Sequence, residues 1–348
     1  MKGSYQSLYE FGSTFLGPML SVYVKAVSDN IDNKVPVCLA REGWLLYGLL
    51  NELSAENHLE LPLPPVYLKV SRTVLLRASL GTASSWKLGL NSKFQGTVLQ
   101  LLMNRFALGF HEAFSTLPED LLSFNVKLPE QSHQVTEWLE PHADRLESLV
   151  KKTKDGLTAY LQQSGLKSSD IEPLMLDIGY SGTIQKLLTE LLEKDTSGLY
   201  FVSLKSGKQR VGRYHANMNG VFHEDIAWND GYSMLDKSLL LESLMTAPHG
   251  SIIDIRCQHN GELAFFYGRE TTSQVFYQDL SVVFRGAIDE VKKIIEKGIY
   301  YSAEEIENLY RVYTETRGAI PSELGYLFGI DDDFSGNGVF NPIDFFGL

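Results

Sequence analysis

A loop with the composition of a phosphate-binding site lies near the middle of the chain. Asp177 ends an apolar run, and Gly179 and Gly182 lie in the stretch that leads into a segment of helical periodicity. The free N–H groups and the dipole of a helix start attract anions, and glycines let the backbone approach them closely. Ser181 and Thr183 add hydroxyl donors. The loop therefore predicts phosphate binding; the alternative is an ordinary strand-to-helix turn capped by Asp177.

Two further apolar runs, both predicted to be strands, are followed by polar residues. These are Arg41, Glu42 and Gly43 after residues 35–40, and Ser71 and Arg72 after residues 66–70. Because an open parallel sheet binds ligands at the carboxyl ends of its strands, we expect the three strand ends to form one crevice. Arginine binds phosphate through paired hydrogen bonds, and the carboxylates of Asp177 and Glu42 suit Mg²⁺. Taken alone, Arg41 and Glu42 are explained equally well by a surface ion pair.

The charge of the chain is strongly negative but unevenly distributed. The net charge of −12 argues against a general binder of nucleic acid or of anionic membranes. Residues 61–111 and 196–223 nevertheless contain no Asp or Glu, while they contain several Lys and Arg. Such segments favour a local positive field for an anion, and the alternative is chance clustering of solvated side chains.

The two cysteines, Cys38 and Cys257, provide neither a disulfide framework nor the spacing of metal ligands. Both lie in strand-like runs, which predicts buried free thiols and fits a reducing cytoplasm. No stretch approaches the roughly 18 apolar residues of a membrane-spanning helix. We therefore expect a cytoplasmic protein.

Strands that alternate with helices predict an α/β fold with a parallel sheet. Residues 1–230 are expected to form this core, with a helical insertion at about 94–166. Residues 231–348 are expected to be mainly helical and to complete the site. The acidic triplet Asp331–Asp333 is predicted to be a surface turn, because the other ligands of a calcium loop are absent.

Five motifs, in this order, resemble a bacterial surface-polysaccharide family whose members are often fused to, or encoded beside, a HAD-type phosphatase. The motifs cover residues 15–18, 39–44, 67–72, 177–185 and 246–250. The resemblance implies a phosphoribosyltransferase-like fold, in which a parallel sheet is flanked by helices. It also implies transfer of ribose 5-phosphate from phosphoribosyl pyrophosphate (PRPP) to a sugar hydroxyl of an O-antigen or capsule.

The same resemblance implies an acceptor substrate, an enzyme that acts next and a cellular location. The acceptor would be a lipid-linked or free oligosaccharide, and a HAD-type phosphatase would act next to remove the 5-phosphate. This chain lacks the Asp-x-Asp-x-Thr start of such a phosphatase, so it would be the transferase alone. A cytoplasmic location is implied, with peripheral association at the inner face of the membrane as an option.

The resemblance further implies roles for the glycine-containing loop. Ser181, Gly182 and Thr183 would hold the 5-phosphate, and Asp177 would bind ribose hydroxyls or position Mg²⁺. Ordinary phosphoribosyltransferases carry a second acid where this chain has Ile178, and their loop is one residue longer. The detailed ribose contacts are therefore expected to differ.

The charged residues of the other two strand ends would hold the leaving group. Arg41, the backbone around Gly43, and Arg72 would bind pyrophosphate, whose charge must be neutralised. A hydroxyl acceptor, unlike an amine, benefits from a general base. Three carboxylates are candidates for it: Glu42, Asp177 and Glu242. Five more residues are predicted to contact the substrates: Ser71, Gly179, Tyr180, Gln185 and His249.

Other functions remain open at this point. A nucleotide-sugar glycosyltransferase would use a DxD-type metal motif, which Asp331–Asp333 matches formally. A non-catalytic docking module of a polysaccharide-synthesis complex would not depend on the polar residues at the strand ends. A phosphatase would need two Asp residues two positions apart at an N-terminal strand end, and no such pair is suitably placed.

Overall fold

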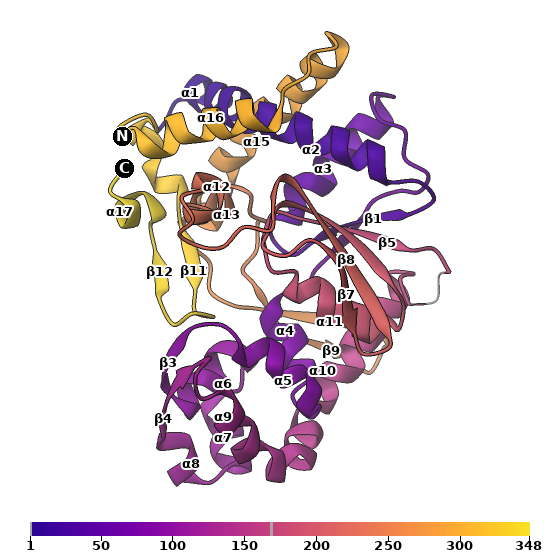
Figure 1. The fold of residues 1–348 in the computed structure, drawn as a ribbon, viewed down its shortest axis with the longest axis vertical. Coiled ribbons are helices and arrows are strands. Elements are labelled where there is room, and N and C mark those ends of the chain that lie inside the picture. The colour runs from indigo at the N-terminus through magenta and orange to yellow at the C-terminus, as the bar shows by residue number, and fades with distance from the viewer. Residues whose placement is uncertain (1, 168–169) are drawn as a thin grey trace.

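The sheet at the centre of the molecule has six strands in the order β2-β1-β5-β6-β8-β7 (Figure 1). The computed structural model describes residues 2–167 and 170–348. All neighbouring strands are parallel except β7, which is antiparallel to β8. The strands are β1 (Val35–Leu39), β2 (Val66–Leu68), β5 (Pro173–Asp177), β6 (Thr196–Ser203), β7 (Gly207–Val211) and β8 (Tyr214–Glu224). The predicted class, an α/β fold with a mostly parallel sheet and a helical C-terminal region, is confirmed.

Both faces of the sheet are buried, which explains why its strands are continuous apolar runs rather than alternating ones. In β1, Cys38 belongs to the hydrophobic core on one face, whereas Val37 and Leu39 belong to the core on the other. In β5, Leu176 faces the first core and Met175 the second. Successive side chains thus alternate between two cores, as the pleat of a strand requires.

Each core is closed by its own set of helices, which Figure 1 shows above and below the sheet. The first core contains residues of α1 (Tyr5–Phe11), α2 (Gly17–Asn30), α3 (Gly43–Ala55), α12 (Ser233–Asp236), α13 (Leu239–Leu244), α15 (Tyr277–Glu296) and α16 (Ala303–Glu315). The second contains residues of α4 (Arg72–Ala78), α10 (Ala143–Gln163) and α11 (Thr183–Leu192). A π-helical turn, Gly12–Leu16, joins α1 to α2.

A mainly helical lobe extends the second core below the sheet (Figure 1). It consists of α5 (Ala83–Leu90), α6 (Val98–Phe106), α7 (Phe110–Thr116), α8 (Glu119–Ser123), α9 (Ser132–Leu139) and α10. It also holds an antiparallel pair, β3 (Phe94–Thr97) and β4 (Asn125–Leu128), which the sequence pattern did not predict. We call this part the helical lobe.

The C-terminal region contributes two hairpins as well as helices. β9 (Ile252–Cys257) pairs with β10 (Leu263–Tyr267), and β11 (Ile330–Asp332) pairs with β12 (Gly338–Phe340). The shorter elements are α14 (Thr272–Val275), the 3-10 turn Ser322–Leu327 and α17 (Pro342–Phe346). We call β11, β12 and the residues between them the C-terminal hairpin.

Two local predictions are wrong. Asp331 and Asp332 lie in β11 rather than in a surface turn, because the backbone pairs with β12. Cys257 is exposed rather than buried, since it ends β9 at the turn into β10; Cys38 is buried as predicted. Over the described ranges, no helix combines the length and apolar character needed to cross a membrane.

Candidate active site

The chain changes direction across the sheet between β1 and β5. From β1 it passes through α3 to β2 on one side, and β5 then pairs with β1 on the other side. α3 belongs to the first core and α11, which follows β5, to the second. The loops after β1 and β5 therefore diverge to opposite faces of the sheet, and open α/β sheets usually bind ligands between such loops, at the carboxyl ends of the strands. We call this region the crevice.

The pairing register brings the three predicted strand ends to one level. Leu39 of β1 pairs with Leu68 of β2, and Cys38 pairs with Leu176, one residue before Asp177. The residues that follow these strands therefore emerge at the same edge of the sheet. The sequence predicted the strand ends, and the structure makes the three strands neighbours in the order β2-β1-β5.

The two helices that start at the crevice have open N-termini. No side chain of the described residues caps α3, which begins at Gly43, or α11, which begins at Thr183. α4, in contrast, is capped by Ser71, whose hydroxyl accepts from the Val74 N–H. Since first-turn N–H groups lack partners within the helix, those of α11 are available to bind an anion, whereas in α3 the Trp44 N–H already donates to the Arg41 carbonyl at 3.2 Å.

Two lysines add positive charge to the loop before α11. Lys186 Nζ donates to the Ser181 carbonyl at 2.9 Å, and the Ser181 and Thr183 hydroxyls lie 3.0 Å apart. Burial and the nearby charge of Lys205 lower the pKa of Lys186. A bound anion would relieve this repulsion. Lys186 was missed from the sequence because it lies within the helix, whereas Lys205 belongs to one of the acid-free segments.

The loop itself leaves room for a ligand. A Cβ on Gly179 would meet no atom of the described chain within 4 Å. Gly182 adopts φ +63°, the left-handed conformation that turns the chain into α11. Gly43 has a packing role, since a Cβ there would lie 2.5 Å from the Cys38 carbonyl carbon.

Three carboxylates influence one another at the crevice. Asp177 is partly buried, and its Oδ1 accepts from the Ile178 N–H at 2.8 Å. Burial and the charge of Glu42 raise the pKa of Asp177 well above its usual range. Burial and Glu42 likewise raise the pKa of Glu242 to about 7. Glu42, only 9% exposed, therefore lies at the centre of the acidic group.

The two predicted arginines belong to the same cluster. Arg41 Nη2 lies 3.9 Å from Glu42 Oε1. The positive charges of Arg72 and Arg41 oppose the rise in the pKa of Glu242. These charged groups come from β5, α13, the start of α4 and the loop after β1.

His249 lies beside this cluster as a neutral ring. With its Nδ1 assigned as the donor to the Gly250 carbonyl at 2.9 Å, its Nε2 accepts from the Tyr67 hydroxyl at 3.0 Å. Burial lowers the pKa of His249, and the charges of Lys69 and Arg41 lower it further. A neutral imidazole here can orient Tyr67 but adds no positive charge for a phosphate.

Two residues predicted to contact substrate use their polar atoms within the fold. The Ser71 hydroxyl donates to the Ile252 carbonyl while it caps α4. Gln185 is fully buried and hydrogen-bonded to three other residues: Thr196, Tyr200 and Asn217. Neither prediction agrees with these contacts, because a buried amide or a capping hydroxyl has no free atom for a ligand.

Tyr180 turns toward the interior of the C-terminal region. Its ring packs edge-on against Trp228 at a centroid distance of 5.5 Å. Its hydroxyl is buried, and the charge of Glu242 adds to burial in raising the pKa of Tyr180. The Tyr180 and Ser238 hydroxyls lack a well-formed hydrogen bond within the described residues. They therefore make the interior beside Glu242 polar.

The donor set at the crevice fits a hard divalent cation shared with a substrate. No group of three His, Cys, Asp or Glu side chains within residues 2–167 and 170–348 is arranged to hold a metal ion. Mg²⁺, however, commonly takes one or two carboxylates and completes its shell with water and substrate phosphates. Asp177 and Glu42, whose mutual repulsion a cation would relieve, provide such carboxylates.

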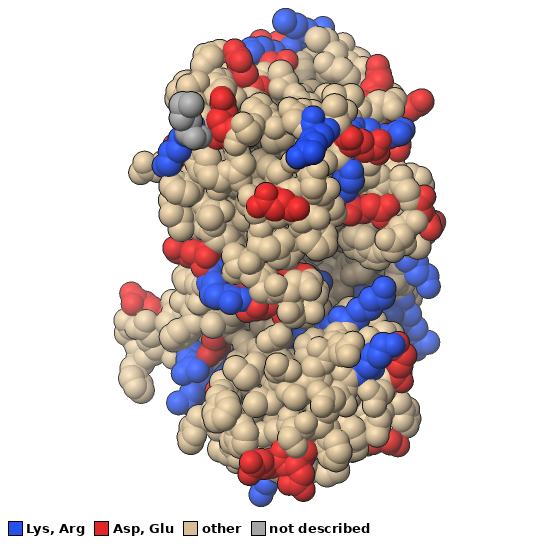
Figure 2. Space-filling model, turned by 90° about the vertical axis from the view of Figure 1, so that its left-hand side faces the viewer, with Lys and Arg blue, Asp and Glu red and all other residues tan. Residues whose placement is uncertain are grey.

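The C-terminal hairpin adds residues that sequence reasoning missed. The charge of Asp332 acts on both Glu242 and Arg105. The Phe334 ring centroid lies 4.3 Å from Arg72 Cζ. Viewed from the side of this hairpin, the surface has a recess at mid-height, with Lys and Arg side chains along its lower border (Figure 2).

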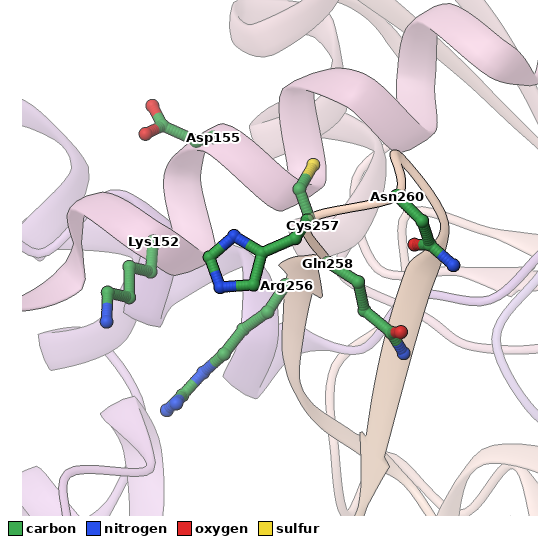
Figure 3. A pocket seen from close by; sticks show the side chains of 7 residues that line it. Lys152, Asp155, Arg256, Cys257, Gln258 and Asn260 are labelled. Carbon is green, nitrogen blue, oxygen red and sulfur yellow. The ribbon is translucent and has the colours of Figure 1, made fainter.

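A second, open depression of about 560 Å³ lies at the turn between β9 and β10 (Figure 3). Its lining includes Lys152, Asp155, Arg256 and Cys257. It is distinct from the crevice: β9 starts at Ile252, beside Ser71, and Cys257 lies five residues on, roughly 16 Å at the rise of a strand. None of its lining residues is a glycine or lies at the start of a helix, so the depression does not have the features of a phosphate-binding loop.

Comparisons with known proteins do not assign the chain to a family. The chain matches no model of a known protein family, and a search of curated proteins finds no match. The fold and the crevice therefore provide the grounds on which a function can be proposed.

Proposed function

We propose that the chain is a glycan phosphoribosyltransferase, which transfers ribofuranosyl 5-phosphate from PRPP to a sugar hydroxyl and releases pyrophosphate. The observation that supports this most is the pair of open helix starts, α3 and α11, on either side of one acidic crevice. A donor with phosphate at both ends of a ribose needs two anion sites with hydrogen-bonding groups between them. The ordered motifs that resemble a polysaccharide-linked family also support transfer from PRPP to a glycan.

In this proposal the 5-phosphate binds at the start of α11. The N–H groups after Gly182 and the hydroxyls of Ser181 and Thr183 donate to it, and Lys186 and Lys205 balance its charge. Backbone N–H groups at a helix N-terminus would thus be the main donors, with the hydroxyls and lysines in support.

The pyrophosphate then lies toward β1 and β2. Arg41 and Arg72 provide guanidinium donors, and the start of α3 at Gly43 provides N–H groups. Asp177 and Glu42 would hold Mg²⁺, which neutralises part of the pyrophosphate charge when it is bound. Asp177 would also bind the ribose hydroxyls of the donor.

The reaction is a displacement at the anomeric carbon. A bond forms between the acceptor oxygen and C1, the bond from C1 to pyrophosphate breaks, and the leaving group takes the electron pair. The acceptor proton goes to a carboxylate, for which Glu242 is our candidate, because a pKa of about 7 suits a general base. Attack opposite the pyrophosphate would convert the α donor into a β-ribofuranosyl product.

The biological setting follows from the same proposal. The acceptor would be a lipid-linked or free oligosaccharide of an O-antigen or capsule, and a HAD-type phosphatase would act next. The reaction would take place in the cytoplasm, at the inner face of the membrane. A nucleotide-sugar glycosyltransferase with Asp331–Asp333 as its metal motif is less well supported, since Arg269 pairs with both Asp331 and Asp333.

The test is thermal unfolding with Mg²⁺ and PRPP, compared with Mg²⁺ and a panel of nucleotide sugars. A ligand at about 100 times its dissociation constant adds roughly 2.7 kcal/mol to the free energy of unfolding, which gives a measurable rise in the melting temperature. We expect Mg²⁺ with PRPP to raise the melting temperature, and Mg²⁺ with each nucleotide sugar to leave it unchanged. Stabilisation by a nucleotide sugar would favour the conventional glycosyltransferase, and stabilisation by neither would favour the docking module.

A further inference from the structure

The C-terminal hairpin reaches the helices that carry Arg72 and Arg105. In Figure 1 it descends from the C-terminal region toward β3 and α6. The Phe334 ring centroid lies 4.3 Å from Arg72 Cζ and 4.8 Å from Arg105 Cζ. Two guanidinium groups from different helices thus share one aromatic ring, which comes from a distant part of the chain.

Arg105 is an anchor for this ring rather than a ligand-binding group. It is completely buried, and all of its hydrogen bonds go to backbone carbonyls, including that of Phe334 at 3.2 Å. The other accepting carbonyls belong to Gly89, Ser92 and Lys93. Since its donors are used in this way, Arg105 fixes the position of Phe334.

Arg72 differs from Arg105 in having free donors. It is exposed, it is the first residue of α4, and it lies at the carboxyl end of β2. Among the described residues, no hydrogen bond or ion pair involves its guanidinium, so its contact with Phe334 is what orients it. A cation over an aromatic face is held by the ring quadrupole, and an arginine held in one orientation loses less entropy on binding an anion.

We propose that Phe334 is a positioning residue of the donor site, whose ring holds the Arg72 guanidinium in the orientation that receives pyrophosphate. This inference rests on the proposed function, because it takes Arg72 to bind the leaving group. It makes the C-terminal hairpin part of the donor site, although the hairpin touches the donor only through Arg72. The aromatic character of residue 334, and not merely its volume, is then required.

An ion pair fastens the hairpin at the residues just before Phe334. Arg269 Nη2 lies 3.1 Å from Asp331 Oδ1 and also pairs with Asp333. If the hairpin positions Arg72, Arg269→Ala should also lower the affinity for pyrophosphate, by a smaller factor than Phe334→Leu. An unchanged affinity in this variant would contradict the positioning role of the hairpin.

The experiment is calorimetric titration of inorganic pyrophosphate with Mg²⁺ into the full chain and its variants. Phe334→Leu removes the quadrupole and should weaken binding about five- to tenfold, whereas Phe334→Tyr keeps the ring and should stay within about twofold. Val339→Ala, at a 47% exposed position of the same hairpin, is the matched control and should bind like the wild type. Thermal unfolding of each variant confirms that it is folded.

A double-variant cycle separates positioning from packing. In an Arg72→Ala background, Phe334→Leu should cause no further loss of affinity, because the group that it positions is gone. If the wild type binds pyrophosphate well and the Phe334→Leu variant binds it as tightly, only the positioning role is overturned. If the wild-type chain does not bind pyrophosphate at all, the donor site itself, and with it the proposed function, is overturned.

Discussion

Asp177 is the residue on which the chemistry depends most. It ends β5 at the crevice, and one of its oxygens is already held by the N–H of its own loop. Such a carboxylate is oriented before a donor arrives, which is the condition for efficient electrostatic catalysis. Burial and the charge of Glu42 raise its pKa well above the usual range, so a proton competes with a cation for this carboxyl.

Asp177→Asn is expected to lower the rate of transfer by about a hundredfold or more, because the amide cannot balance Mg²⁺ or a developing positive charge. Stability should be unchanged or higher, since the substitution removes repulsion by Glu42. The matched control is Asp155→Asn, at an exposed position of the β9–β10 depression. Transfer within tenfold of the wild type would remove Asp177 from the site.

Glu242 gives the protein a specific dependence of stability on pH. Its pKa of about 7 in the folded state is above the ordinary value of about 4.3 for an unfolded chain. The folded state therefore binds the proton more tightly, and its stability falls as pH rises from about 4.3 through 7. Glu242→Gln should melt at a higher temperature than the wild type at pH 8, with a smaller difference toward pH 5.

Thermal unfolding of both proteins across this range, with Glu323→Gln at an exposed position as the control, checks this prediction. An equal difference in melting temperature at pH 5 and pH 8 would show that Glu242 has an ordinary acidity in the folded chain.

At the scale of elements, the turn into α11 depends on Gly182. Its φ is +63°, and a Cβ would lie 2.5 Å from the Met218 sulfur. Gly165 has φ +76°, and a Cβ there would meet no atom of the described residues within 4 Å, so it carries the same backbone strain without the clash. Gly165→Ala should cost about 1 kcal/mol of unfolding free energy and Gly182→Ala about 2 kcal/mol.

Only Gly182→Ala should also weaken PRPP binding, because a displaced turn moves the N–H groups of α11. Urea unfolding and calorimetric titration of both variants provide the comparison. Equal effects of the two substitutions on PRPP affinity would mean that this turn does not bind the donor.

The elements that carry the site were predictable because their signals are local. Apolar runs followed by Arg41, Ser71 and Asp177 are typical of buried parallel strands, and all three strands are present. The partners of individual side chains were not predictable. Gln185 is a core amide because Thr196 and Tyr200 come to lie beside it, and no spacing within the helix reveals that.

At the scale of the whole molecule, the two ends of the chain form one core. A Cβ on Gly286 of α15 would lie 2.0 Å from the Tyr9 carbonyl oxygen, and one on Gly12 would lie 1.9 Å from the Val283 carbonyl oxygen. Backbones that approach so closely leave no room for a methyl group. The N-terminal helices and α15 are therefore expected to unfold together.

Gly286→Ala should lower the free energy of unfolding by about 2–4 kcal/mol, because either helix must move to admit the methyl group. Gly48→Ala is the control: it lies in α3, where an added Cβ would meet no atom of the described chain within 4 Å, and it should be neutral or stabilising by about 0.5–1 kcal/mol. Equal stabilities of the two variants in urea unfolding would contradict the close packing of α15.

The C-terminal hairpin shows what the sequence could not reveal at this scale. Asp331–Asp333 has the composition of a surface turn, and Phe334 that of a tail residue. Their positions beside Arg72, Arg105 and Arg269 depend on how the hairpin packs across two distant parts of the chain. Such contacts arise from the complete fold, so local composition does not predict them.

The most direct test of the account is a crystal structure of the protein with PRPP and Mg²⁺ bound. We expect the 5-phosphate within hydrogen-bond distance of the N–H groups that follow Gly182, and the pyrophosphate against Arg41 and Arg72. Density for PRPP away from the carboxyl ends of β1 and β5, for example in the depression beside Cys257, would contradict the assignment of the crevice as the donor site.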